Sequence, residues 1–442
     1  MMPAWPVTAT EARVVDRRIL KGAVRTGVTI ALLVALIGII VPAGLGWDFA
    51  NFYDTGRRAA AGQVGDIYNP ESPIGGAAPQ GRMTFWGAPV SAWFYAPLAP
   101  LRPATALLLF KLAGTLAYAA ALLLLFRHLA GAGGFGAEER RWFAAATIVL
   151  ILLYQPFWTM YRVGGQTTPF VFLLLVAGLL SYERERFLAA SACLLLAVLI
   201  KPAMLFVPAF LALVGGRRFF LTLTGVFVAG GLVSIALAGW PVHREFIEMA
   251  RRGSSKPSPW FFNSSIYILA DLVRPIEHSA PLRGAPGGRL AAQLGAAMKL
   301  AVLGVFVVLA VRFHRHRLIA PPRRRGEFML ALSFCLLVSQ VVWEHYLALL
   351  FIPLLWLVSL GHRLPRGAVR WLGAVVLFSV LQNLVLIEFF REHVTISSHP
   401  VLLLVSLVKC APLLLYLGWL LRYHRPLFAG VGLPGAGPVP AG

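Results

Sequence analysis

Long apolar runs separated by short arginine-rich segments are the feature that most constrains this chain. Hydrophobic residues fill 58% of the 442 positions and charged residues only 13%, too few charges to cover a water-soluble fold of this size. We predict an all-α polytopic membrane protein with about 12 transmembrane helices of roughly 20 residues each. The predicted spans are 24–46, 97–126, 142–160, 168–181, 187–200, 202–214, 219–239, 290–311, 327–343, 345–360, 369–389 and 399–421.

Arginines gather in alternate connections between these runs. The segments "YERERF", "GGRRFF" and "RFHRHRLIAPPRRRGE" each carry at least two. Because basic loops stay on the cytoplasmic side of a membrane, we predict a plasma (inner) membrane protein with both termini in the cytoplasm. The net charge of +22 then reflects loops that meet lipid headgroups rather than nucleic acid.

The other connections, on the outer (periplasmic or extracellular) face, hold acids, His, Asn, Gln, Ser and Trp. Two of them are long. In residues 47–96, apolar side chains such as Phe49 and Tyr53 share one helical face, which predicts short helices lying on the membrane. The second loop covers 240–289. The predicted organisation is one integral membrane domain, 1–421, followed by a disordered cytoplasmic tail rich in Gly and Pro, 422–442.

Asp48 follows the first predicted span directly. It could cap an interfacial helix, or it could be a carboxylate in a partly dry pocket that takes a proton as a general base. Burial would raise its pKa, whereas Arg57 or Arg58 would lower it. Asp54 competes for this role, but beside Thr55 it is expected to face solvent.

Lys201 and the "WEHY" segment interrupt otherwise apolar sequence. A lysine at membrane depth must be paired or reach the surface, so Lys201 either snorkels at a helix end or holds a phosphate. An aromatic belt explains Trp343 and Tyr346 but not the adjacent Glu344 and His345. His345 could donate to a leaving phosphate or hold an acceptor hydroxyl.

Weaker candidates occupy other outer segments. Gln166 offers an amide donor and acceptor to a polyol. Trp260 and Asn263 suit sugar stacking and hydrogen bonding, although an aromatic belt explains them equally well. The sequence has no nucleotide-binding motif, and we predict no required cofactor. A divalent metal stays open, because the chain offers suitable ligand types at Asp48, Asp54, Glu344 and His345.

Four segments in order resemble glycosyltransferase family 87: "WDFANFYDTGRRAAAGQVGDIYNP", "FWGAPVSAWFYAPLAPL", "GGQTTPFVF" with "LIKP", and "WEHYLALLFIPLL". The resemblance covers about residues 20 to 420. These are membrane enzymes of the C-type superfamily, similar to polyprenyl-phosphate-mannose-dependent mannosyltransferases. The resemblance implies a C-type fold with interfacial helices in the first outer loop. It also implies a polyprenyl-phosphate sugar donor, a glycolipid or glycan acceptor, and transfer with inversion.

Within that resemblance, Asp48 matches the family's catalytic base, and three further motif positions fall on Gln166, Lys201 and His345. One departure is Tyr95-Ala96-Pro97, where the family often has Tyr-Pro-Pro. We predict Asp48 and His345 as catalytic residues and Lys201 with Arg57 as the donor-phosphate site. The predicted substrate contacts are Tyr53, Gln166, Trp260, Asn263, Glu344 and Tyr346.

A polyprenyl-lipid flippase or secondary transporter is the alternative. Such a protein places ionisable groups near the bilayer midplane on broken helices, and Lys111, inside the second predicted span, is the residue that suits it. A structural scaffold is a third possibility, but it gives no reason for Asp48, Lys201 and His345 to share one side.

Overall fold

The computed structural model describes the greater part of the chain as helices. The described residues are 46–69, 85–132, 141, 143–144, 147, 161, 165–254, 263–271, 276–277, 280–281, 288–315, 322–360, 364–381 and 399–424. Within them the only strands are β1 (Ile276–Glu277) and β2 (Ala280–Pro281), a short antiparallel pair. The prediction of an all-helical protein is confirmed. The predicted span 24–46 and most of 142–160 lie outside the described residues.

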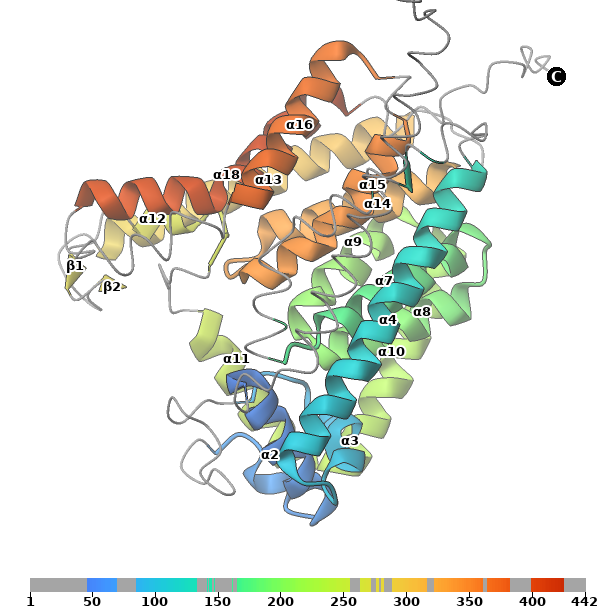
Figure 1. The fold of residues 1–442 in the computed structure, drawn as a ribbon, viewed down its shortest axis with the longest axis vertical. Helices are drawn as coiled ribbons and strands as arrows, with labels where there is room; N and C mark the ends of the chain where they lie inside the picture. Colours follow the sequence, from blue (N-terminus) through green and yellow to red (C-terminus); the bar gives the residue numbers. More distant parts are fainter. Residues whose placement is uncertain are drawn as a thin grey trace, which may run out of the picture.

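Four helices run side by side as the main bundle (Figure 1). They are α4 (Pro103–Ala132), α7 (Thr168–Glu183), α8 (Phe187–Ile200) and α10 (Arg217–Ala238). Helix α7 lies at the centre and packs against α4, α8 and α14, and its residues Val171, Leu175 and Leu179 are fully buried. A proline in the first turn starts α7 without losing a helical hydrogen bond.

Helix α8 ends where the sequence predicts, at Ile200. The next residue, Lys201, has φ −139° and ψ 89°, an extended conformation that the following Pro202 imposes by steric clash. The α7–α8 hairpin therefore begins at Thr168 and returns to Lys201, so that these two residues share one end of the bundle.

The remaining helices pack against this bundle and against one another. Helix α9 packs on α14, α12 on α13, and α16 on α18. Their bounds are η4 (Pro202–Leu205), α9 (Phe206–Val214), α12 (Ile268–Asp271), α13 (Gly288–Arg315), α14 (Pro322–Val338), η5 (Glu344–Leu350), α15 (Phe351–Ser359), α16 (Arg366–Leu381) and α18 (His399–Tyr423).

The segment after residue 46 forms short helices with an aromatic core of its own, at the lower end of the bundle in Figure 1. The Phe52 and Tyr95 rings stack with centroids 4.9 Å apart. Gly56 must lack a side chain, because a Cβ there would lie 2.6 Å from the Tyr95 carbonyl. The elements of this segment are α2 (Trp47–Ala60), η1 (Val64–Asp66), η2 (Pro89–Ser91), α3 (Ala92–Tyr95) and η3 (Ala96–Leu98). Helix α11 (Trp240–Ser254), from much later in the chain, packs against η1 and η2.

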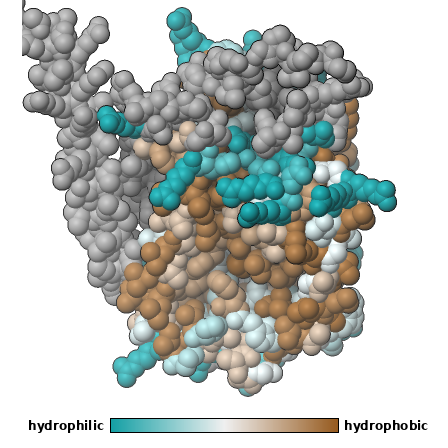
Figure 2. All heavy atoms as spheres, turned by 90° about the vertical axis from the view of Figure 1, so that its right-hand side faces the viewer, coloured by the Kyte–Doolittle hydropathy of each residue, from teal (hydrophilic) through white to brown (hydrophobic). Residues whose placement is uncertain are grey.

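The surface is that of a membrane protein. Among the described residues four helices are long and apolar enough to span a bilayer: α4, α10, α13 and α18. Leucines such as Leu232 of α10 and Leu300 of α13 are strongly exposed, and Figure 2 shows a broad hydrophobic face beneath a row of hydrophilic atoms. Lipid, unlike water, would cover such a face without cost. Helices α7 and α8, with 16 and 14 residues, are only about 21–24 Å long, which is shorter than the bilayer core. The count of about 12 transmembrane helices therefore remains a prediction.

Several predicted boundaries were wrong. Helix α4 begins at Pro103 rather than at residue 97, because the prolines before it break the chain into η3 and a turn. Helix α14 ends at Val338 rather than 343. The segment 240–289 opens with an amphipathic helix, α11, that the sequence analysis did not predict.

Candidate active site

The end of the α7–α8 hairpin that carries Thr168 and Lys201, here termed the site end, gathers most of the predicted site residues. Helix α2 reaches it from one side, and the Gln166 Nε2 donates a hydrogen bond to the Asp48 carboxylate. Gly165 permits this approach, since it has φ +66° and a Cβ on it would lie 2.7 Å from the Phe49 Cβ. The chain therefore places residues 118 positions apart in contact.

Asp48 lies in the first turn of α2, whose N-cap is Gly46. The prediction that Asp48 could serve as the cap is therefore wrong. Burial raises the pKa of Asp48 to about 6, while the charge of Lys201 and the hydrogen bond from Gln166 oppose the rise. A carboxylate with this pKa is ionised at neutral pH and still basic enough to take a proton.

Lys201 is buried, with 7% of its surface exposed, so it does not snorkel. Its Nζ donates to the Thr168 Oγ1 at 2.8 Å and lies 4.1 Å from the centroid of the Tyr346 ring. Burial lowers the pKa of Lys201 to about 7, and the negative charge of Asp48 acts in the opposite direction. The ammonium is thus held in a poorly hydrated place, where an added anion would stabilise it.

His345 and Tyr346 enter the same site from η5. The two rings meet edge to face with centroids 4.8 Å apart, and His345 is buried. Within the described part of the chain, the His345 Nδ1 and the Tyr95 hydroxyl have no hydrogen-bond partner. Burial and the nearby Asp48 raise the pKa of Tyr95. Buried polar atoms are nearly always paired, so each of these two atoms keeps an unused hydrogen-bonding capacity.

Other predicted residues on α2 have defined partners. The Tyr53 hydroxyl donates to the Leu101 carbonyl at 2.7 Å. Arg57 is exposed and lies over the Tyr53 ring at 5.9 Å. Asp54 pairs with Arg58 at 3.3 Å and its side chain is only 16% exposed, so the prediction that Asp54 faces solvent was wrong.

Asn263 supports the η5 segment. Its side-chain oxygen accepts from the Val342 and Ser265 amides at 2.9 and 3.0 Å, and the Ser264 amide donates to the Val342 carbonyl at 2.7 Å. These bonds hold the start of the "WEHY" segment in place. Trp260 and the Glu344 side chain lie outside the described residues. Among those described, no three His, Cys, Asp or Glu side chains are grouped closely enough to hold a metal ion.

Two contributors were missed by the sequence analysis as site residues. Thr168 reads as an ordinary helix start before a proline, and Tyr95 as one aromatic among many. The signal for Tyr95 was the Tyr95-Ala96-Pro97 segment: the tyrosine agrees with the family's Tyr-Pro-Pro, and only the departure at Ala96 was noted. For Thr168 no sequence signal marks the contact with Lys201.

The model of glycosyltransferase family 87 matches residues 85–340, more than half of the chain. The protein belongs to glycosyltransferase family 87. No protein of curated function matches the sequence significantly.

Membership of family 87 makes this chain a membrane glycosyltransferase, which uses a sugar donor and an acceptor, and it decides against the transporter alternative. The matched residues include Gln166 and Lys201, whereas Asp48 and His345 lie on either side of the match. For this family 87 protein, the case for Asp48 and His345 therefore depends on their place beside Lys201 in the structure.

Proposed function

We propose that this glycosyltransferase moves a hexose, mannose in the first instance, from a polyprenyl-phosphate sugar to a hydroxyl of a lipid-linked or glycan acceptor, with inversion. One observation carries the proposal: the Asp48 carboxylate, held by Gln166, and the Lys201 ammonium, held by Thr168, lie in one site, where the charge of each acts on the pKa of the other. A general base and a cation for the departing phosphate are the two groups that a single displacement needs.

The proposed step is one displacement at the anomeric carbon. Asp48 takes the proton of the acceptor hydroxyl while the acceptor oxygen forms its bond to the anomeric carbon. The bond from that carbon to the phosphate oxygen breaks on the opposite face, and its electron pair leaves with the polyprenyl phosphate. Because attack and departure occur on opposite faces, the sugar configuration inverts.

Lys201 is the proposed anchor for the phosphate. Its ammonium is desolvated and has the Thr168 hydroxyl as a neutral partner, so a phosphate oxygen would gain more from it than from a lysine in water. The phosphate would in turn keep Lys201 protonated. His345, with its unpartnered Nδ1, is the proposed second group on the departing phosphate, and the exposed Arg57 a contact at the entrance.

The amide of Gln166 is proposed to orient the Asp48 carboxylate toward the acceptor. Substrate contacts from Tyr53, Trp260, Asn263, Glu344 and Tyr346 belong to the same proposal. Tyr346, beside both Lys201 and His345, has the strongest support among them, because a sugar between the charged groups would meet its ring.

The proposed setting is a plasma (inner) membrane, with both termini in the cytoplasm and the site at the outer face. The support is the distribution of arginines. Arg184 and Arg186 follow α7 and Arg324 lies beside them, at the opposite end of the hairpin from Lys201. Positive residues favour the cytoplasmic side. The chain is proposed to form one membrane domain over 1–421, with 422–442 as a tail.

A transfer assay tests the proposal. Purified protein in nanodiscs receives radiolabelled polyprenyl-phosphate mannose, other polyprenyl-phosphate hexoses and a panel of glycolipid acceptors. Wild type is expected to label an acceptor with the inverted anomeric configuration. The Asp48→Asn protein should lose about 10²–10⁴-fold in rate, whereas Asp66→Asn, an exposed carboxylate in the same segment, should not.

The Asp48→Asn variant is expected to fold. Since burial raises the pKa of Asp48 to about 6, its contribution to stability falls as the pH rises through that value, and a neutral amide should not lower the unfolding temperature at neutral pH. Full transfer by folded Asp48→Asn protein would overturn the base assignment. No transfer from any polyprenyl-phosphate donor by the wild type would overturn the donor class.

A further inference from the structure

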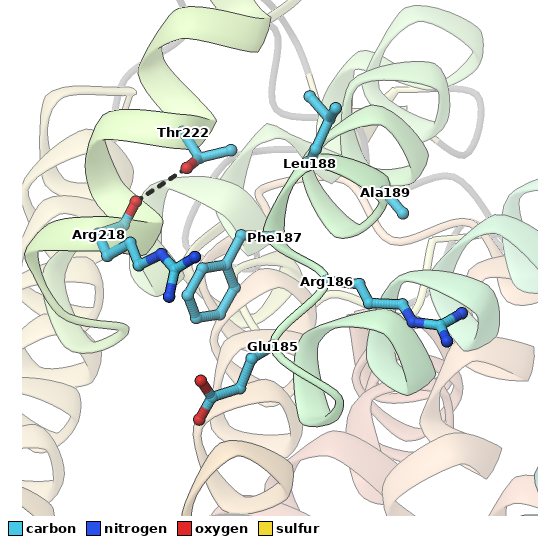
Figure 3. Close-up of a pocket in the computed structure, with 7 residues that line it drawn as sticks. All are labelled: Glu185, Arg186, Phe187, Leu188, Ala189, Arg218 and Thr222. Carbon is cyan, nitrogen blue, oxygen red and sulfur yellow. Dashed lines mark hydrogen bonds between the residues drawn. The ribbon is translucent and has the colours of Figure 1, made fainter.

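A second site lies at the other end of the α7–α8 hairpin, here termed the arginine end (residues Glu183–Phe187 with Arg324 and Arg325 of α14). A cavity of about 410 Å³ opens there between the turn after α7 and the first turns of α10. Figure 3 shows Arg218 and Thr222 on one side of it and Arg186, Leu188 and Ala189 on the other. Helix α7, with 16 residues, separates this cavity from Lys201 by about 24 Å.

The cavity carries an excess of positive charge. Its one acid, Glu185, is already paired with Arg324 at 2.8 Å. Arg186 and Arg218 are both exposed, and Arg218 lies beside the Phe187 ring at 5.8 Å from its centroid (Figure 3). The two cavity arginines are therefore available for an anion, and arginine binds phosphate oxygens in a two-pronged geometry.

The rim of the cavity is apolar and faces outward. Leu188, in the lining, is 69% exposed, and Leu221, one residue before Thr222, is 56% exposed. A free phosphate ion would gain nothing from these side chains. An amphiphile would gain from both parts, its phosphate at the arginines and its acyl chains along the leucines.

We propose that this cavity binds the phosphate headgroup of an anionic membrane phospholipid. Arg218, beside the Phe187 ring, holds the phosphate, Arg186 on the far side of that ring adds positive charge (Figure 3), and the exposed leucines of α8 and α10 border the acyl chains. Because α8 runs without a break from Phe187 to Ile200, a bound headgroup would also set the depth of Lys201 in the membrane. The inference does not depend on which sugar or acceptor the site end uses.

Lipid titration of the full-length protein in detergent, followed by native mass spectrometry, tests the proposal with phosphatidylglycerol and phosphatidylcholine as probes. The double variant Arg186→Gln/Arg218→Gln should bind phosphatidylglycerol about tenfold more weakly, the loss expected for a charge-assisted hydrogen bond to the phosphate. The charge-retaining double variant Arg186→Lys/Arg218→Lys should lose less than the glutamine double, because lysine keeps the charge but not the two-pronged geometry. Its remaining binding would show that the cavity tolerates substitution.

The matched control removes two exposed arginines of α16, Arg366→Gln/Arg370→Gln, and should change binding less than threefold. Equal weakening in both glutamine doubles would overturn the proposal, because the effect would then be net charge alone. Unchanged binding in the cavity double would also overturn it. So would displacement of the lipid by inorganic phosphate at millimolar concentration, or equal affinity for phosphatidylcholine.

Discussion

The two ends of the α7–α8 hairpin both bury charged side chains, yet they treat them differently. At the arginine end, the Glu183 carboxylate is held by Arg325 at 2.7 and 2.9 Å and by His128 at 2.8 Å. At the site end, Lys201 donates a hydrogen bond to a neutral hydroxyl, that of Thr168, and the His345 Nδ1 has no hydrogen-bond partner among the described residues.

This contrast separates a carboxylate with filled hydrogen bonds from a candidate site whose buried groups keep unused hydrogen-bonding capacity. The Glu183 carboxylate, with both oxygens bonded, holds α7 and α14 in register and has no oxygen left for a ligand. Buried groups with shifted pKa and incomplete pairing reduce stability unless a ligand completes them. The site end holds buried groups of this second kind. Burial brings the pKa of Asp48 to about 6 and that of Lys201 to about 7, although the opposite charges of the two groups attract each other.

The comparison predicts its largest effect at Lys201. Lys201→Met removes the cation proposed to stabilise the departing phosphate, so kcat/KM should fall about 10²–10³-fold, or roughly 3–4 kcal/mol. Its unfolding temperature should not drop, since a desolvated ammonium whose hydrogen-bond partner is a neutral hydroxyl is replaced by an apolar side chain of similar length. Steady-state transfer kinetics with melting curves measure both.

The matched control is Lys299→Met. Lys299 is partly buried, donates to the Gln340 Oε1 at 2.9 Å and lies over the Tyr267 ring, so it resembles Lys201 in its surroundings but not in its place. Less than fivefold loss is expected there. Equal losses of kcat/KM in the two variants would mean that removal of either lysine impairs transfer, and would contradict a specific role for Lys201.

The arginine end should respond in the opposite way. Glu183→Gln leaves Arg325, whose side chain is only 14% exposed, without its counter-charge, which should lower the free energy of unfolding by about 3 kcal/mol. Transfer by the fraction that remains folded should stay within about twofold of wild type. Denaturation in detergent, with activity measured on the same samples, tests this.

The opposite result for Glu183→Gln would contradict this contrast between the two ends. If Glu183→Gln abolished transfer in protein with a wild-type unfolding curve, the arginine end would belong to the catalytic machinery. The exposed pair Arg244 and Glu248, 3.9 Å apart, supplies the reference, because Glu248→Gln on the surface should change stability by less than about 1 kcal/mol.

The pH dependence should report both charged groups. Below about pH 6 the carboxyl of Asp48 is protonated, so kcat/KM should fall about tenfold per pH unit on the acid side. Above about pH 7 the ammonium of Lys201 loses its proton, and kcat/KM should fall again. In kcat the alkaline limb should move to higher pH, because a bound donor phosphate stabilises the ammonium.

A flat profile between pH 5 and 8 would contradict this assignment. The two variants test which group causes which limb of the pH profile. The residual activity of Asp48→Asn should lack the acid limb, and that of Lys201→Met should lack the alkaline limb. Wild-type circular dichroism over the same range controls for unfolding.

The sequence predicted the parts of the site that break a pattern. Lys201 interrupts an apolar run, and Pro202 after it determines where α8 ends, so both the residue and the boundary could be predicted. His345 and Asp48 likewise lie at the edges of apolar runs. Nothing in the sequence gives the contact between Asp48 and Gln166, because it depends on how α2 packs against a loop far along the chain.

Other failures have local physical causes. The start of α4 was placed too early because apolar composition continues through Pro97 and Pro100, where the backbone cannot stay helical. Asp54 was expected in solvent because it lies in mid-segment beside Thr55. In the structure it pairs with Arg58, one helical turn away, and its side chain is only 16% exposed. Such pairing on a packed helix face cannot be distinguished from exposed i, i+4 pairing by spacing alone.

The smallest predicted effect concerns Thr168, the neutral partner of Lys201. Thr168→Val keeps the shape of the side chain and removes the oxygen that accepts from the Lys201 Nζ at 2.8 Å, a loss of about 1 kcal/mol and hence about fivefold in kcat/KM. A lysine with one acceptor fewer should lose its proton more readily, so the alkaline limb should move to lower pH by less than one unit.

Thr168→Ser, which restores the oxygen, should restore both values. A packing role alone would lower stability in Thr168→Ser through the lost methyl group and leave the alkaline limb in place in both variants. The direction of that limb therefore decides whether Thr168 tunes the charge of Lys201 or only fills space beside it.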